Sequence, residues 1–148
     1  RKMKVGKVTF TEAYKAVNEY RQKFPQKAVT FYAQNYPAMG WAVFMAGGSC
    51  PVIPCTDKAF LKDAAAMEVE ETSTDEYKKM VKSDIGSIIY SKSGTEIPVQ
   101  LSSGKYVLKY IHPASGKIET INKSLKINGL YNLKVPDKKE GIYWFHKL

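Results

Sequence analysis

Gly104-Lys-Tyr-Val-Leu-Lys-Tyr-Ile-His-Pro-Ala-Ser-Gly-Lys-Ile-Glu-Thr-Ile121 is the stretch of this 148-residue chain that decides the fold. It holds two alternating runs, one on each side of the turn His112 to Gly116. Pro113 suits the first central position of a type I turn, and Gly116 can adopt the positive φ that follows. The stretch therefore predicts an antiparallel β-hairpin.

The same two-residue alternation continues through most of the C-terminal half. Turn-forming pairs such as Ser93-Gly94 and Asn128-Gly129 separate the runs. The predicted strands cover residues 86–90, 96–101, 105–111, 117–121, 124–127, 131–135 and 142–147. The segment 78–82 adds either a helical turn or one more strand. Seven to eight short strands with this pattern predict an antiparallel β-sandwich over residues 76–148.

The N-terminal half has the spacing of helices. Thr9 and Glu12 form a capping box before a run with apolar residues every three or four positions. Pro37 opens a second run that is apolar on every face, and Asp57 is a candidate N-cap for a third. The predicted helices cover residues 9–24, 37–47 and 57–67.

Two short apolar segments, residues 27–33 and 50–54, lie between these helices and predict strands. Helices that alternate with covered parallel strands favour a βα-repeat arrangement over residues 1–70. The acidic segment 68–75 is then a linker to the sandwich. The predicted fold class is α+β, with a βα-repeat remnant followed by an antiparallel sandwich.

Charge bears on the choice of partner. The chain carries 23 basic and 14 acidic residues, a formal net charge of +9. The excess is even, because residues 1–83 hold 13 basic and 9 acidic side chains and residues 84–148 hold 10 and 5. Only Arg1 and Arg21 are arginines, whereas phosphate-binding surfaces favour the guanidinium fork. We therefore expect a solvated lysine-rich surface and no nucleic-acid partner.

Membrane and metal sites are not expected either. The longest uncharged run, Ala28 to Thr56, is interrupted by prolines and polar residues. Cys50 and Cys55 have no further Cys or His nearby to complete a zinc site. A disulfide between them is an alternative, but the extended segment between them favours two buried free thiols. The sequence predicts no metal and no cofactor.

Aromatic and histidine side chains are the remaining candidate functional groups. The strands are partly apolar on both faces, which favours core packing, and Tyr110 and Trp144 are the best candidates for carbohydrate contact. His112 and His146 have no Cys or Ser partner at an informative spacing. Turn and strand-end roles are therefore favoured over a catalytic dyad.

Several motifs in a fixed order carry a resemblance to a known family. They are Trp41-Ala-Val-Phe-Met-Ala-Gly-Gly-Ser49, Phe60-Leu-Lys-Asp-Ala-Ala-Ala-Met67, Ile85-Gly-Ser-Ile-Ile-Tyr-Ser91, Gly104-Lys-Tyr106, His112-Pro-Ala-Ser-Gly116 and Trp144-Phe-His-Lys-Leu148. With them the chain resembles the C-terminal region of TIM-barrel glycoside hydrolases of the Bacteroidetes type, in which the barrel runs into a β-sandwich. The resemblance implies that residues 9–67 correspond to the last barrel units, and that the chain is a fragment or completes its sheet with a second chain.

The resemblance also implies where the chemistry would lie. Retaining hydrolases of this clan use two carboxylates about 5–5.5 Å apart, and the nucleophile stands at the end of the seventh strand. In this chain that place holds Ala33-Gln-Asn35, and no Asp or Glu occurs from Tyr20 to Thr56. We therefore expect no catalytic residue in the chain itself.

Tyr32, Gln34 and Asn35 are candidates for a sugar subsite at this barrel end, with core packing by Tyr32 and loop capping by Asn35 as the alternatives. The expected function is the C-terminal portion of a secreted glycoside hydrolase with a structural sandwich. Its expected partners are the remainder of the barrel or a second chain, and carbohydrate; its expected location is secreted, periplasmic or on the cell surface. The alternatives are a stand-alone carbohydrate- or matrix-binding module and a basic nucleic-acid binder.

Overall fold

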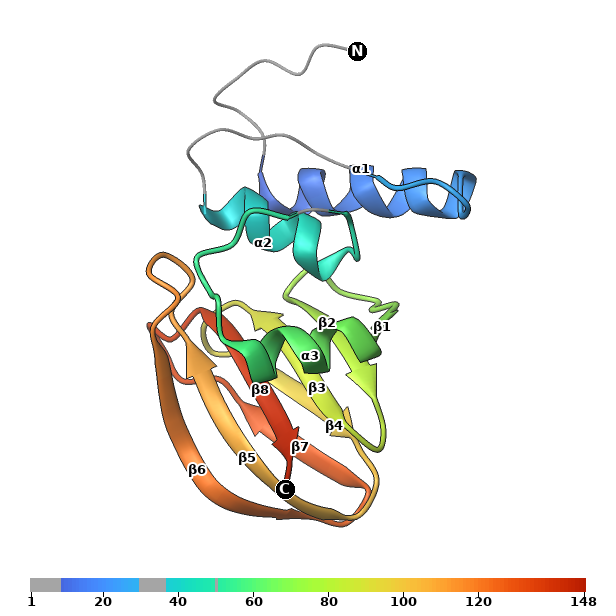
Figure 1. Ribbon diagram of the computed structural model, residues 1–148. Coiled ribbons are helices and arrows are strands. Elements are labelled where there is room, and N and C mark those ends of the chain that lie inside the picture. The colour runs from blue at the N-terminus through green and yellow to red at the C-terminus, as the bar shows by residue number, and fades with distance from the viewer. Residues whose placement is uncertain (1–8, 30–36, 50) are drawn as a thin grey trace. The chain divides into compact units, whose positions relative to one another are not determined.

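The computed structural model describes residues 9–29, 37–49 and 51–148, which fold into two compact units. One unit comprises residues 1–54 and the other residues 55–148. The third helix therefore belongs with the strands, whereas its sequence pattern predicted a place in the segment 1–70. Figure 1 shows the helices and strands by label.

The first unit contains two packed helices, α1 (Phe10–Lys23) and α2 (Pro37–Met45). The predicted capping box is confirmed, because Thr9 N–H donates to the Glu12 carboxylate and Glu12 N–H donates to the Thr9 hydroxyl. The two helices meet closely beside Gly48, where an added Cβ would lie 2.6 Å from Val43 Cγ1 of α2 and 3.1 Å from Val17 Cγ1 of α1. Both predicted helices thus form where their capping and apolar patterns place them.

The predicted parallel strands of this unit are not seen. Lys27 to Val29 form no strand, and the rest of the expected strand 27–33 lies outside the described residues. Residues 51–54 form no strand either, because prolines at both ends of that segment remove ladder donors. A backbone hydrogen bond of 2.7 Å links the Ser49 N–H, just before the second segment, to the Val29 carbonyl in the first. The chain is α+β as predicted, but the described residues contain no closed barrel and do not form the expected βα-repeat.

The second unit is one helix and eight strands. Helix α3 (Lys58–Ala66) is followed by β1 (Glu68–Glu70), β2 (Tyr77–Lys82), β3 (Gly86–Ser91), β4 (Glu96–Gln100), β5 (Gly104–Ile111), β6 (Ile118–Ile127), β7 (Leu130–Lys134) and β8 (Gly141–Lys147). All of the strand pairs are antiparallel. They form a six-stranded sheet in the order β1-β2-β3-β8-β5-β6 and a two-stranded sheet of β4 and β7 (Figure 1).

Three details of the strands either differ from the prediction or settle an alternative that it left open. The segment 78–82 is a strand, part of β2, and not a helical turn. Glu68–Glu70, expected in the linker, pairs with β2 as the edge strand β1. The expected strands 117–121 and 124–127 are one long strand, β6, whose register against β5 shifts near Leu108. Such a shift bends a strand without ending it, which the alternating pattern alone does not distinguish from a turn.

The hairpin that dominates the sequence is confirmed between β5 and β6. His112 N–H donates to the Lys117 carbonyl at 2.9 Å, and Gly116 N–H donates to the His112 carbonyl at 2.8 Å. Gly116 has a φ of 75°, which an L side chain adopts only at a cost. Gly116 therefore has the backbone role that the sequence predicts.

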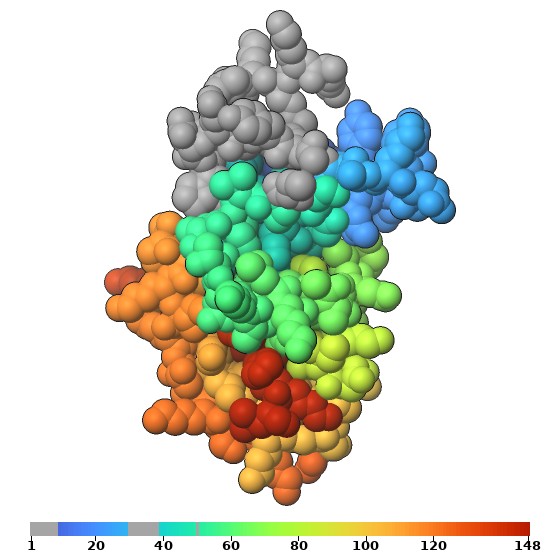
Figure 2. Space-filling view, in the orientation of Figure 1, coloured from blue at the N-terminus to red at the C-terminus, as the bar shows by residue number. Residues whose placement is uncertain are grey.

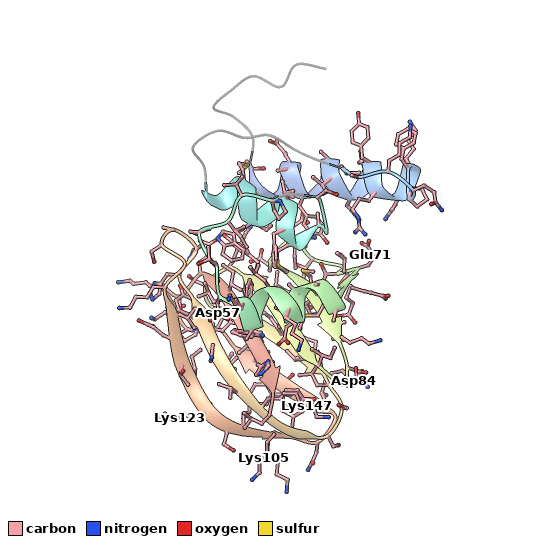
Figure 3. The ribbon with its side chains drawn as sticks, in the orientation of Figure 1. Asp57, Glu71, Asp84, Lys105, Lys123 and Lys147 are labelled. Atoms are coloured by element: carbon pink, nitrogen blue, oxygen red, sulfur yellow. The ribbon has the colours of Figure 1, made fainter. Side chains whose placement is uncertain are left out.

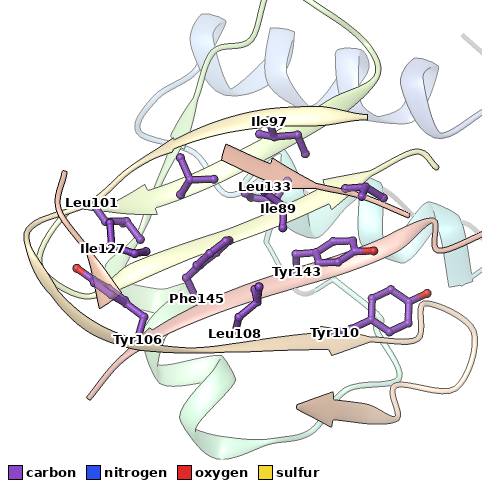
Figure 4. Packing of buried hydrophobic residues seen from close by; sticks show 12 residues of the cluster. Ile89, Ile97, Leu101, Tyr106, Leu108, Tyr110, Ile127, Leu133, Tyr143 and Phe145 are labelled. Carbon is purple, nitrogen blue, oxygen red and sulfur yellow. The ribbon is translucent and has the colours of Figure 1, made fainter. Parts of the chain in front are cut away.

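A hydrophobic core fills the space between the two sheets. Alternate residues of β5, Tyr106, Leu108 and Tyr110, point into it with Tyr143 and Phe145 of β8 (Figure 4). The other members are Ile89, Ile97, Val99, Leu101, Ile127, Leu133 and Val135. Because side chains alternate along a strand, Trp144 and His146 of β8 lie on the opposite face of the large sheet, the face that α3 covers.

Candidate functional site

Helix α3 is positioned by its ends and by one buried face. The Asp57 carboxylate accepts the Phe60 N–H at 2.9 Å and so caps the helix as predicted. Phe60 and Asp63, one turn apart, are both buried. An apolar ring and a carboxylate therefore face the sheet from the same side of the helix.

The buried carboxylate of Asp63 is the centre of the candidate site. Trp144 Nε1 donates to its Oδ2 atom at 2.9 Å, and His146 Nδ1 lies 2.7 Å from the same oxygen. Because an ionised carboxylate only accepts hydrogen bonds, we assign the proton to Nδ1. The Phe60 ring packs edge-on against Trp144, with centroids 5.3 Å apart and planes at 81°. Polar and apolar contacts together fasten α3 to β8.

The burial of the Asp63 carboxylate determines the role of these contacts. Only 6% of Asp63 is exposed, and burying a carboxylate is costly unless donors replace water. Two donors do so here, one of them the indole that lies under Phe60. No described residue hydrogen-bonds His146 Nε2, so no described hydroxyl or thiol is activated by the imidazole. The site holds a helix on a sheet. The C-terminal residues lie at the surface beside α3 (Figure 2).

A second polar cluster lies at the start of β8. The Tyr110 hydroxyl donates to the Glu140 carbonyl at 2.7 Å, and the Tyr143 hydroxyl donates to the Lys139 carbonyl at 2.8 Å. Burial, followed by the charge of Glu140, raises the pKa of Tyr90 to about 12. Burial, followed by the proximity of Tyr110, raises the pKa of Tyr143 to about 12. These phenols are held protonated and tie the loop before β8 to the core.

We expect this cluster to make the protein sensitive to alkali. The unfolded chain releases phenolic protons near pH 10, whereas Tyr90 and Tyr143 retain theirs to about pH 12 when folded. The contribution of these two phenols to stability is therefore fully present below pH 10. From pH 10 to 12 the free energy of unfolding falls by about 1.4 kcal/mol per pH unit for each tyrosine. Absorbance at 295 nm, followed with circular dichroism, should show these two tyrosines ionising with unfolding. A single transition near pH 10 for all tyrosines of the folded protein would contradict it.

An ion pair lies at the surface of the hairpin formed by β5 and β6. His112 Nε2 lies 3.1 Å from Glu119 Oε1, and Lys139 Nζ lies 3.6 Å from Glu119 Oε2. Contact with the His112 imidazole, assisted by the Lys139 charge, lowers the pKa of the Glu119 carboxyl. All three side chains are partly exposed, so salt and water screen the pair and its contribution to stability is small.

The predicted binding residues fall into two groups. Tyr32, Gln34 and Asn35 lie outside the described residues. Tyr110 and Trp144, which the sequence offered as exceptions to core packing, are 5% and 0% exposed. Neither has an open ring face for a sugar, because Tyr110 belongs to the core between the sheets and Trp144 lies under α3. Core packing, the favoured alternative, describes their place.

The cysteine prediction is tested at one of its two positions. Cys55 is a buried free thiol, and burial raises its pKa. A raised pKa keeps the thiol protonated and unreactive at neutral pH. Cys50 lies outside the described residues. Within the described ranges no group of three or more His, Cys, Asp or Glu side chains could hold a metal ion.

The sequence patterns did not predict Asp63 as the partner of His146. One signal was present, because Asp63 lies one turn after Phe60, on the face that a helix over a sheet must bury. A charged residue in that position needs a buried donor, and β8 offers an indole N–H and an imidazole. The spacing of 83 positions between Asp63 and His146 hides the pair in the sequence.

Fold and contacts thus define an α+β chain whose C-terminal unit is an antiparallel sandwich covered by one fastened helix. Residues 1–67 match a family described as "Domain of unknown function (DUF6298)". No curated protein matches the chain. A solved structure titled "Glycoside hydrolase" is 14% identical, with a TM-score of 0.40, over 56% of this chain and 20% of its own. This chain therefore spans about one fifth of the length of that hydrolase.

None of the helices in the described ranges is both long and apolar enough to cross a membrane.

Proposed function

We propose that this chain is the C-terminal portion of a secreted glycoside hydrolase, in which residues 55–148 form a structural accessory unit. The observation that carries the proposal is the fastening of α3 by the buried Asp63 carboxylate, which accepts hydrogen bonds from Trp144 and His146. Buried polar and aromatic contacts hold this helix rigidly on the large sheet of the sandwich. The expected partner of the preceding segment is the remainder of a barrel.

The reaction itself is assigned to residues outside this chain. A retaining glycosidase needs one free carboxylate as nucleophile and a second as acid/base. Asp63 is buried and committed to two donors, and no acidic residue occurs from Tyr20 to Thr56. The alternative of a sandwich that binds carbohydrate through Tyr110 and Trp144 has less support, because both rings are buried.

Asp63→Ala tests the structural role. It leaves Trp144 Nε1 and His146 Nδ1 without their acceptor, so we expect it to lower the free energy of unfolding by about 1–3 kcal/mol. Asp84→Ala is the matched control, because Asp84 is exposed in the turn between β2 and β3 (Figure 3). We expect that control to change stability by less than about 0.5 kcal/mol. Urea unfolding followed by circular dichroism measures both.

Activity separates a structural unit from a reaction site. The longer hydrolase should cleave aryl glycosides with the same kcat/KM whether or not it carries Asp63→Ala, when measured below its melting temperature. Residues 1–148 alone should show no hydrolysis. Glycoside cleavage by residues 1–148, or a drop in kcat/KM without loss of stability, would contradict the proposal.

A further inference from the structure

The C-terminal end of α1 carries an exposed pair of aromatic rings. Tyr20 is 58% exposed and Phe24 39% exposed, although both are large apolar side chains. They lie one helical turn apart, with ring centroids 6.3 Å apart and planes within 22° of parallel. The residues that α1 buries are others, namely Ala13, Tyr14 and Val17. The pair is therefore not used in the core of its unit.

Backbone contacts fix the position of this pair. Phe24 N–H donates to the Tyr20 carbonyl at 2.8 Å, and Lys27 N–H donates to the Phe24 carbonyl at 3.0 Å. The Arg21 guanidinium, between the two rings in sequence, donates to the Ala46 carbonyl at 2.9 Å and anchors this turn of the helix. Rings on an anchored turn lose little conformational freedom when a ligand covers them, which favours binding.

Two ammonium groups adjoin the rings. Lys23 Nζ lies 5.8 Å and Lys27 Nζ 5.4 Å from the centroid of the Phe24 ring, within the range of a cation–π contact. No carboxylate follows in the chain until Asp57. Glu19 lies four positions before Lys23, the spacing at which a carboxylate and an ammonium group on a helix can face each other, whereas Lys27 has no acidic residue within seven positions on either side. We call Tyr20, Lys23, Phe24 and Lys27 the aromatic–lysine patch.

The simplest role for this patch is to stabilise the helix end through ring stacking and cation–π contacts. Those contacts do not require the rings to be exposed, and exposed cation–π pairs contribute only about 0.5–1 kcal/mol. Two exposed rings beside two exposed ammonium groups instead form a surface with an apolar part and a cationic part. A matching ligand has a flat apolar face and a carboxylate.

We propose that the aromatic–lysine patch binds an acidic saccharide, namely a uronate-containing glycan. The rings stack on the apolar face of a pyranose, and the Lys23 and Lys27 ammonium groups pair with its carboxylate. Charge complementarity selects this ligand over a neutral glycan. The inference rests on the proposed carbohydrate-related function and adds a substrate class to it.

Calorimetric titration of the full chain with tetragalacturonate, and with neutral cellotetraose, tests the proposal. The uronate should bind at least tenfold more tightly at low salt and should lose most of that advantage at 0.5 M NaCl, because salt screens exposed charges. Tyr20→Ala and Phe24→Ala should each weaken uronate binding at least fivefold. The double variant Lys23→Gln/Lys27→Gln should weaken it by a similar factor.

Lys105→Gln/Lys123→Gln is the matched control. It removes the same two charges from exposed lysines on β5 and β6 (Figure 3) and should leave the affinity within twofold. Equal losses in both double variants would show general charge attraction and overturn the assigned patch. Absence of uronate binding, or tighter binding of single-stranded poly(U), would overturn the ligand class.

Failure of this inference and failure of the proposed function give different results. If the longer hydrolase cleaves glycosides while the patch variants bind uronate normally, the inference alone is wrong. If uronate binding depends on the patch while the longer protein cleaves no glycoside, the proposed function alone is wrong.

Discussion

Trp144→Ala is expected to lower the free energy of unfolding by about 3–5 kcal/mol, the range for removing a fully buried tryptophan. Trp144 is completely buried, packs edge-on with Phe60 and donates to Asp63. The substitution therefore opens a cavity under α3 and removes one of the two donors that compensate a buried carboxylate. Since a domain of this size is stable by only about 5–15 kcal/mol, we expect partial unfolding at 37 °C.

Trp144→Phe separates the two contributions of the indole. It keeps most of the packing against Phe60 but removes the N–H group that donates to Asp63. We therefore expect a free energy of unfolding between those of wild type and Trp144→Ala. Urea unfolding followed by far-ultraviolet circular dichroism is a suitable measurement, because it does not depend on the tryptophan itself. Equal stability of wild type and Trp144→Ala would show that α3 does not depend on this contact.

Gly86→Ala is expected to have the next largest effect, a loss of at least about 3 kcal/mol from backbone strain and a steric clash. Gly86 has a φ of 151°, which L residues rarely adopt. An added Cβ would lie 1.8 Å from the Phe145 carbonyl oxygen, a backbone atom of β8. The strands can relieve that overlap only by moving apart, which disturbs the part of β8 that carries His146 opposite Gly86.

Gly129→Ala separates backbone strain from the clash. Gly129 also has a positive φ, 89°, but a Cβ there would meet nothing within 4 Å. Its cost should be that of the backbone alone, about 1–2 kcal/mol. Thermal melting of both variants gives the comparison. A loss for Gly86→Ala no larger than that for Gly129→Ala would mean that β3 and β8 do not approach each other as closely as the structure places them.

Local patterns predicted the helices and the central hairpin because their signals lie within a few residues. Thr9 and Glu12 cap α1 through contacts three positions apart, and Gly116 takes the positive φ of the turn. Most strands of the sandwich also lie where the alternating pattern places them. In each case the residues that determine the element lie close together in the sequence.

The errors arise where a distant segment decides the outcome. Glu68–Glu70 has no strand pattern of its own and becomes β1 because β2 offers it an edge. The pairing of Asp63 with His146 likewise depends on a helix and a strand that meet only after folding. The predicted parallel strands also needed neighbours, which the described part of the chain does not provide.

The most direct test of the account is hydrogen exchange of the α3 backbone amides in wild type and in Asp63→Ala. The account predicts that wild-type amides after the first turn of α3 open with nearly the same free energy as those of β3 and β8, because the helix is fastened to that sheet. Asp63→Ala should accelerate exchange in α3 by roughly tenfold or more relative to the sheet, about 1.4 kcal/mol of local opening. If α3 exchanges as fast as a frayed helix in wild type while the sheet stays protected, the sandwich and its helix are not one structural unit and the account is contradicted.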